Sequence, residues 1–188
     1  KNDNDKSLKE IVIYGDLSAE AKSGFKRGLI LGEYVNKARE IANTPACDMT
    51  PTQLGKEAIQ LGKEDKFTVK VLGEKELKVL KMGALLAVGQ GTKSETKLIV
   101  AEYWGAGKPI GKSIDKSKQP IVLLGKGITF DSGGLNIKPS GSMHDMHLDM
   151  SGGSAVLSAI ACVAKLNLKK NIIVIVPAAE NSVSDDAM

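Results

Sequence analysis

Apolar residues in the first quarter of the chain recur at the spacing of a helix. Phe25 and Leu29 begin a series that repeats every three or four residues. Ser18 is a suitable N-cap in front of this series, and the sequence Asn-Thr-Pro at residues 43–45 stops it. The pattern therefore predicts one long connecting helix from Ser18 to about Ala42.

The segments on either side of this helix carry shorter signals. Residues 1–9 are polar and predict a disordered linker, and Ile11–Tyr14 is a short strand candidate. After the helix, Thr50 is a suitable N-cap and is followed by Pro51 at the first helical position. This combination predicts a second helix that ends near Leu61.

The rest of the chain predicts strands that alternate with helices. The predicted strands cover residues 67–71, 98–103, 121–124 and 172–176, and the predicted helices cover residues 74–82 and 155–164. Ile121–Leu124 and Ile172–Val176 are continuous apolar runs, which are typical of strands buried on both faces of a parallel sheet. Together with the helix between them, these runs predict a β-loop-α-β unit of parallel type. We expect an α/β fold with a mixed, largely parallel sheet flanked by helices in three αβα layers.

Charged side chains gather directly after the strand at Ile121–Leu124. Lys126 and Asp131 follow it, separated by an expected loop that closes on Gly133 and Gly134, and Asp149 precedes a glycine pair that opens an apolar helix. Ligands of open α/β sheets bind outside the carboxyl ends of the strands, so a site is expected here. The residue types alone permit an ion-paired structural cluster or a metal site, because a dication would favour a neutral amine and ionised carboxylates.

Composition excludes several other classes of function. The 188 residues carry a formal net charge of +4 from lysines scattered between acids, which makes nucleic-acid binding unlikely. The two cysteines, Cys47 and Cys162, form no disulfide framework or ligand motif. No apolar run approaches the roughly 20 residues of a membrane span, and no signal peptide opens the chain, so we expect a soluble cytoplasmic protein without membrane contact.

Two stretches of the chain resemble a known family. GKGITFDSGG at residues 125–134 and NIKPSGSMHDMHLDMSGG at residues 136–153 resemble the signature region of the leucyl aminopeptidase family, the dinuclear-metal cytosol aminopeptidases. The resemblance implies that Lys126, Asp131 and Asp149 are metal ligands, with Asp131 bridging two divalent ions, Zn²⁺ or Mn²⁺. It also implies that Lys138 polarises the scissile carbonyl and that Met146 lines the pocket for the first side chain.

The resemblance further implies the reaction and the assembly. Family members use a metal-activated water to release the first residue, leucine-like ones preferred, from peptides with a free N-terminus, and they form hexamers. They also use an Asp, a Glu and an Arg from an NTDAEGR-like motif that lies beyond Met188 in family order. We therefore expect an incomplete catalytic domain, and a 188-residue chain that is inactive alone, holds at most one metal weakly and exposes the edge of strand Ile172–Val176.

The same resemblance divides the chain into a linker, strand and connecting helix at residues 1–42 and the N-terminal part of the catalytic domain at residues 43–188. His144 and His147 lie within the second of these stretches, but neither is expected to be a ligand. Glu180 and Asn181 follow the last strand, and we expect them to support the site. The alternative hypothesis is a non-catalytic structural or DNA-contacting module with a vestigial metal site.

Overall fold

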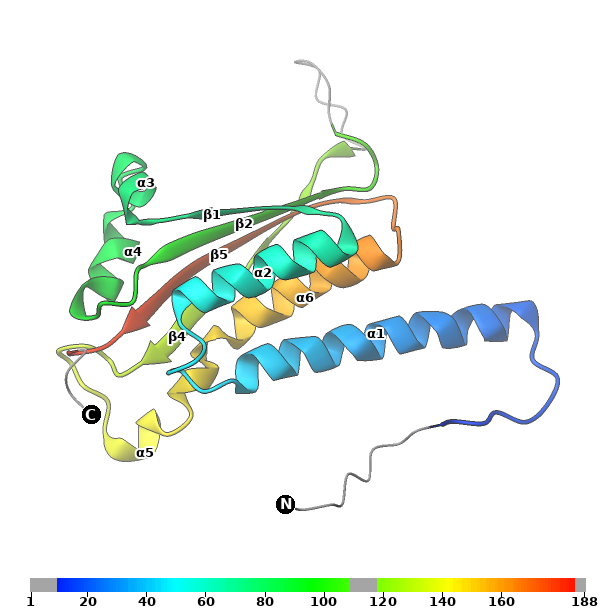
Figure 1. The fold of residues 1–188 in the computed structure, drawn as a ribbon, viewed down its shortest axis with the longest axis horizontal. Coiled ribbons are helices and arrows are strands. Elements are labelled where there is room, and N and C mark those ends of the chain that lie inside the picture. Colours follow the sequence, from blue (N-terminus) through cyan, green and yellow to red (C-terminus); the bar gives the residue numbers. More distant parts are fainter. Residues whose placement is uncertain (1–9, 109–117, 185–188) are drawn as a thin grey trace.

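A computed structural model describes residues 10–108 and 118–184 of the chain (Figure 1). The helices are α1 (Ala19–Asn43), α2 (Pro51–Asp65), α3 (Glu74–Val79), α4 (Gly83–Val88), α5 (Ser140–Met143) and α6 (Ser151–Lys165), with the 3₁₀ turns η1 (Gly89–Gly91) and η3 (Met146–Met150). The strands are β1 (Thr68–Leu72), β2 (Lys97–Trp104), β3 (Ile121–Leu124), β4 (Gly127–Asp131) and β5 (Asn171–Asn181).

The five strands form one mixed sheet in the order β1, β2, β5, β3, with β4 also paired to β5. The pairs β1–β2 and β2–β5 are antiparallel, while β3 and β4 both run parallel to β5. β3 pairs with the first half of β5 and β4 with its second half, so the two act as one interrupted strand. The expected mixed α/β fold is confirmed, with parallel pairing in the described residues confined to β3 and β4 on β5.

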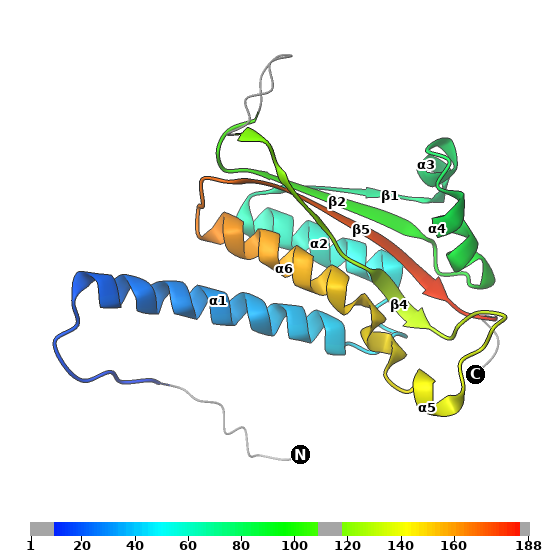
Figure 2. The same cartoon turned by 180° about the vertical axis from the view of Figure 1, so that it is seen from behind.

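Three helices cover one face of the sheet (Figures 1 and 2). α2 and α6 pack on the strands, and α1 packs along α6. Leu54 of α2, Leu157 of α6 and Val174 of β5 are fully buried in this main core. Because side chains alternate along a strand, Ile99 of β2 faces this core while its neighbour Leu98 faces a smaller cluster on the other side, under α3 and α4.

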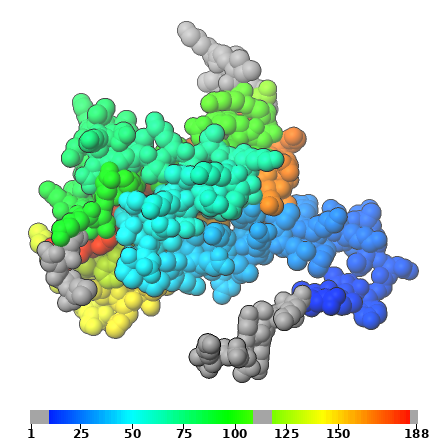
Figure 3. Space-filling view, in the orientation of Figure 1, coloured from blue at the N-terminus to red at the C-terminus, as the bar shows by residue number. Residues whose placement is uncertain are grey.

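The helix caps that the sequence predicts are present. The Ser18 hydroxyl accepts a hydrogen bond from the Ala21 N–H at 3.2 Å, and the Thr50 hydroxyl accepts one from the Gln53 N–H at 3.2 Å. The carboxyl half of α1 enters the main core through Tyr34. Its amino-terminal half extends beyond the body of the molecule (Figure 3).

Several predicted elements differ from the structure. Ile11–Tyr14 forms no strand; it is exposed coil, because the described residues give it no neighbouring strand to pair with. The polar residues 1–9 lie outside the described part. The segment between Lys126 and Asp131, which the sequence indicates as a loop, is strand β4.

β3 is not buried on both faces. Ile121, Val122 and Leu124 are 51%, 56% and 71% exposed, because within the described residues β3 pairs with β5 alone and lies at an edge of the sheet. The expectation that Ile172–Val176 would expose an edge is wrong as well. This segment is the middle of β5, which lies between β2 and the interrupted strand β3–β4.

One stretch, Ser140–Lys165, is long and apolar enough by length and composition to cross a membrane, contrary to the expectation from the sequence. In the structure it consists of α5, η3 and α6, and Leu157 and Ile160 of α6 are fully buried in the main core. Packing inside the domain therefore accounts for its apolar character.

Candidate metal centre

The interruption between β3 and β4 places Lys126 beside the start of α6. The Gly125 N–H donates to the Ile175 carbonyl at 3.0 Å, and the Gly153 N–H donates to the Lys126 carbonyl at 2.7 Å. A Cβ on Gly125 would lie 2.5 Å from the Gly152 carbonyl oxygen, so the helix can approach this closely because residue 125 has no side chain. The Lys126 side chain leaves the sheet and stays 59% exposed.

Lys126 reaches the first candidate carboxylate across this junction. Its Nζ lies 3.3 Å from Oδ2 of Asp149, which is carried by η3, a turn that lies against β4. This Oδ2 is buried and accepts no hydrogen bond from the described residues, so the ammonium contacts it by charge alone. A buried carboxylate oxygen in this state retains its capacity to bind a cation.

Asp131 is the second candidate carboxylate and ends strand β4. Its Oδ2 lies 3.0 Å from Nζ of Lys138, and its Oδ1 accepts hydrogen bonds from Asn181 Nδ2 at 2.6 Å and from the Gly133 N–H at 3.1 Å. Burial alone would raise the pKa of this carboxyl. The hydrogen bonds from Lys138, Asn181 and Gly133 together outweigh burial and lower its pKa below the usual range.

A tight loop brings Lys138 back to Asp131. The Lys138 N–H donates to the Ser132 carbonyl at 2.9 Å, which closes the loop at its base. Gly133 has φ of +90°, and a Cβ there would lie 2.4 Å from the Asn136 carbonyl oxygen. Any other residue at this position would therefore be strained, which explains the Ser-Gly-Gly sequence after Asp131.

The structure thus assembles four of the five predicted site residues into two ion pairs, Lys126–Asp149 and Lys138–Asp131. Met146 is half-buried on η3, the turn that also carries Asp149. His144 is exposed and His147 is half-buried.

The candidate donors, two aspartates and a lysine, fit a divalent metal although the set includes a lysine and no histidine or cysteine. In the described ranges, no group of three or more His, Cys, Asp and Glu residues could hold a metal ion by itself. The two aspartates supply oxygens, one of them buried and without a hydrogen bond, and Lys126 adds a nitrogen that becomes a donor when neutral.

Two residues around Asp131 were less visible in the sequence. Asn181 was expected to support the site, and its hydrogen bond to Asp131 is such a contact. Ser132 carried no prediction. A serine between an aspartate and a glycine pair is a known turn former, and this was the signal that could have indicated it.

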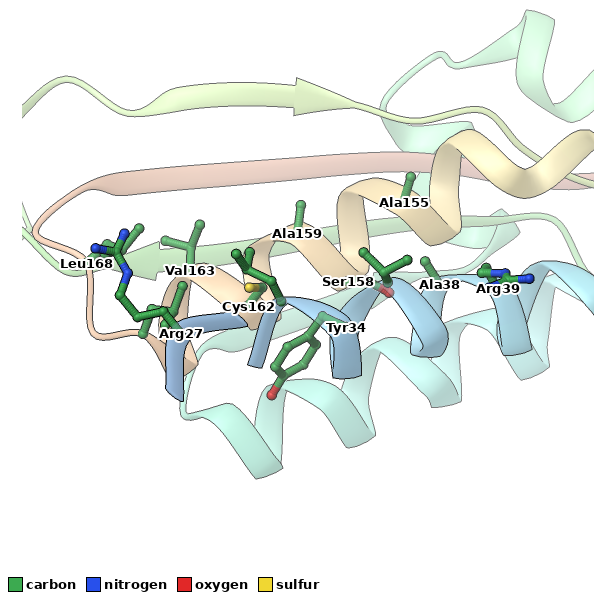
Figure 4. Close-up of a pocket in the computed structure, with 13 residues that line it drawn as sticks. Arg27, Tyr34, Ala38, Arg39, Ala155, Ser158, Ala159, Cys162, Val163 and Leu168 are labelled. Carbon is green, nitrogen blue, oxygen red and sulfur yellow. The ribbon is translucent and has the colours of Figure 1, made fainter. Parts of the chain in front are cut away.

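Two cavities of the structure differ in their relation to the predicted site residues. A groove of about 570 Å³ between α1 and α6 is lined almost wholly by apolar side chains, with Arg27 and Arg39 toward its two ends (Figure 4). None of the predicted site residues lines it. A cavity of about 480 Å³ adjoins Lys126, between α4 and the sheet, and its lining does not include Met146.

Residues 36–188 match the model of the cytosol aminopeptidase family, catalytic domain. A probable cytosol aminopeptidase from Polaromonas naphthalenivorans is 41% identical over 181 residues, which cover 96% of this chain and 34% of the relative. One from Nitrosococcus oceani is 44% identical over 162 residues, 86% of this chain and 31% of the relative. The chain spans about a third of the length of these curated relatives.

Solved structures give the same relationship. A cytosol aminopeptidase from Coxiella burnetii superposes with a TM-score of 0.73 at 30% identity, over 88% of this chain and 33% of that one. The bottromycin maturation enzyme BotP in complex with Mn gives 0.76 at 30% identity, over 87% and 34%. The mixed α/β fold and the matched region together define the class, the aminopeptidase catalytic domains. The chain belongs to the cytosol aminopeptidase family.

Proposed function

We propose that the protein containing this chain is a metal-dependent aminopeptidase that releases the N-terminal residue of peptides with a free N-terminus. The observation that carries the proposal is the pairing of two lysines with two partly buried aspartates at the carboxyl end of a strand, within the region that matches the family. The relatives, which are about three times as long as this chain, are named cytosol aminopeptidases, and this supports the release of an N-terminal residue as the reaction.

In this proposal, Lys126, Asp131 and Asp149 hold two divalent ions, Zn²⁺ or Mn²⁺. When bound, such ions lower the pKa of water and polarise a carbonyl. BotP is named as a complex with Mn, which supports a metal of this type. The low pKa of Asp131 keeps its carboxylate ionised, as a ligand must be.

The chain's own residues then have distinct tasks. Lys138 directs its ammonium to the oxyanion that develops on the substrate, because the Ser132 loop holds it beside Asp131. Met146 contributes an apolar wall that favours leucine-like first residues. Lys138 is thus the proposed catalytic residue, and Met146 a specificity residue.

The remaining parts of the proposal concern the whole protein. A cytoplasmic location is supported by the names of the relatives. We also propose a homo-hexamer and a division into residues 1–42 and a catalytic part at residues 43–188, with the 188-residue chain alone inactive. The hypothesis of a structural or DNA-contacting module is not carried forward, since the described residues give no observation in its favour.

Replacing Asp131 by Ala in the parent protein tests the proposal. We expect wild type to hydrolyse leucyl p-nitroanilide and to hold metal after dialysis, and the Asp131→Ala variant to lose both. Asp145→Ala is the matched control, because Asp145 is an exposed aspartate of the same segment. Wild-type activity and metal content in Asp131→Ala would refute the assignment.

A further inference from the structure

Asn181 ends the central strand β5 and contacts both halves of the candidate centre. In the register of the sheet it lies opposite Asp131, the last residue of β4. Its side-chain amide donates a hydrogen bond to Asp131. Its backbone carbonyl accepts hydrogen bonds from Ser132, which begins the loop that carries Lys138.

The side chain fixes the orientation of the Asp131 carboxylate. Asn181 Nδ2 donates to Oδ1 at 2.6 Å, while Nζ of Lys138 lies 3.0 Å from the other oxygen, Oδ2. Two donors on different oxygens prevent the carboxylate from rotating about its χ2 angle. The direction of its remaining lone pairs is thereby set.

The backbone of Asn181 ties down the loop that carries Lys138. Its carbonyl accepts hydrogen bonds from the Ser132 N–H at 2.9 Å and from the Ser132 hydroxyl at 2.7 Å. Ser132 in turn accepts from the N–H groups of Gly134 and Lys138. The amide oxygen of Asn181 also lies against Gly134, where a Cβ would approach it to 2.9 Å.

We propose that Asn181 is a positioning residue that holds the Asp131 carboxylate and the Ser132–Lys138 loop in one arrangement. The inference rests on the proposed function for what Asp131 and Lys138 do. It adds that their relative placement depends on an amide supplied by β5. Replacing a residue that orients a metal ligand in this way typically lowers metal affinity or activity by 10–100-fold.

The experiment uses Asn181→Ala and Asn181→Asp in the full-length parent protein. We expect Asn181→Ala to bind Mn²⁺ 10–100-fold more weakly than wild type in a chelator competition. The Asn181 carbonyl remains in this variant, so faster amide exchange is expected at Gly133, whose N–H donates to the same Oδ1 of Asp131 as the Asn181 amide. Asn181→Asp should be affected at least as strongly, because it replaces a donor with a carboxylate beside Oδ1 of Asp131. Thermal midpoints check that each variant is folded.

Ser182→Ala is the matched control, because Ser182 is the next residue and its hydroxyl donates to the Ser184 carbonyl, away from Asp131. It should behave as wild type in both measurements. Wild-type Mn²⁺ affinity in Asn181→Ala, or unchanged exchange at Gly133, would overturn the inference while the proposed function stands. If wild type itself binds no Mn²⁺, the proposed function fails, and the exchange measurement at Gly133 alone decides whether Asn181 orients the Asp131 carboxylate.

Discussion

Lys126 and Lys138 make ion pairs of similar length but in different surroundings. The Lys126 side chain is 59% exposed, whereas Lys138 is 29% exposed and is held by a closed loop against a carboxylate that is 16% exposed. An exposed ion pair in water contributes little to stability, so folding energy alone does not explain the exposed Lys126. The better-held Lys138 suits a role in stabilising a transition state, which requires a charge that is already in place.

Replacing Lys138 by Ala should therefore separate turnover from metal binding. We expect kcat for a leucyl amide to fall by about 100-fold or more, as when a single oxyanion donor is removed, with metal content near that of wild type. Lys169→Ala, at an exposed lysine in the turn before β5, should leave both unchanged. Metal loss in Lys138→Ala would instead mean that Lys138 helps to hold the metal, as a ligand or through its contact with Oδ2 of Asp131.

The two cysteines provide a test of burial at single residues. Burial, with smaller contributions from the charges of Asp65 and Glu33, raises the pKa of the Cys162 thiol. Cys162 is also 8% exposed, whereas Cys47 is exposed. At pH 8 we expect iodoacetamide to modify Cys47 first and Cys162 slowly, since the thiolate is the reactive form. In Cys47→Ala the fast phase should vanish; a fast phase that survives would show that Cys162 is accessible.

Among the elements, α1 and α2 are joined by a buried polar contact. The Tyr34 hydroxyl of α1 donates to Oδ2 of Asp65 at the end of α2 at 2.6 Å, and Lys165 of α6 lies 3.7 Å from Oδ1. Burial and this hydrogen bond raise the pKa of Tyr34 above its usual range, which favours the protonated hydroxyl that donates to Asp65. Three helices therefore meet at one carboxylate.

Removing this hydroxyl should destabilise the domain. In Tyr34→Phe the buried Asp65 oxygen loses its donor, and the free energy of unfolding should fall by about 1–3 kcal/mol in a urea titration. Tyr14→Phe is the control, because Tyr14 is 93% exposed and should change nothing measurable. An unchanged midpoint in Tyr34→Phe would mean that Lys165 or water replaces the lost donor.

Elements with strong local signals were predictable. Ser18 and Thr50 begin their helices as expected, because a side-chain cap satisfies orphan N–H groups whatever the tertiary context. β4 was not predictable, since its five residues contain no continuous apolar run and become a strand by pairing with the far half of β5. α4, six residues that begin at a glycine, gave too short a pattern.

The candidate site was likewise predictable from the sequence only in part. The order of Lys126, Asp131, Lys138 and Asp149 can be read from one stretch of sequence, and the structure pairs these residues. The hydrogen bond from Asn181 could not be derived from spacing, because it depends on the parallel register of β4 on β5.

At the scale of the molecule, the described sheet has edge strands at β1 and β3, and of the two it is β3 that exposes large apolar side chains. Exposed apolar strand edges favour pairing with another chain. We therefore expect the 188-residue polypeptide to show concentration-dependent association in sedimentation velocity, and Val122→Lys, at a 56% exposed position, to reduce it. Ser23→Lys adds the same charge on exposed α1 and should not reduce it. Equal association of the two variants would point to another surface.

The hydrogen bond between Asp131 and Asn181 also has a consequence in time. The two residues are 50 positions apart in the chain. At ribosomal rates of 5–20 residues per second, β4 is synthesised roughly 3–10 s before the end of β5. For that interval the nascent Ser132–Lys138 loop lacks the amide and carbonyl that shape it, so the centre acquires its geometry only after β5 has paired.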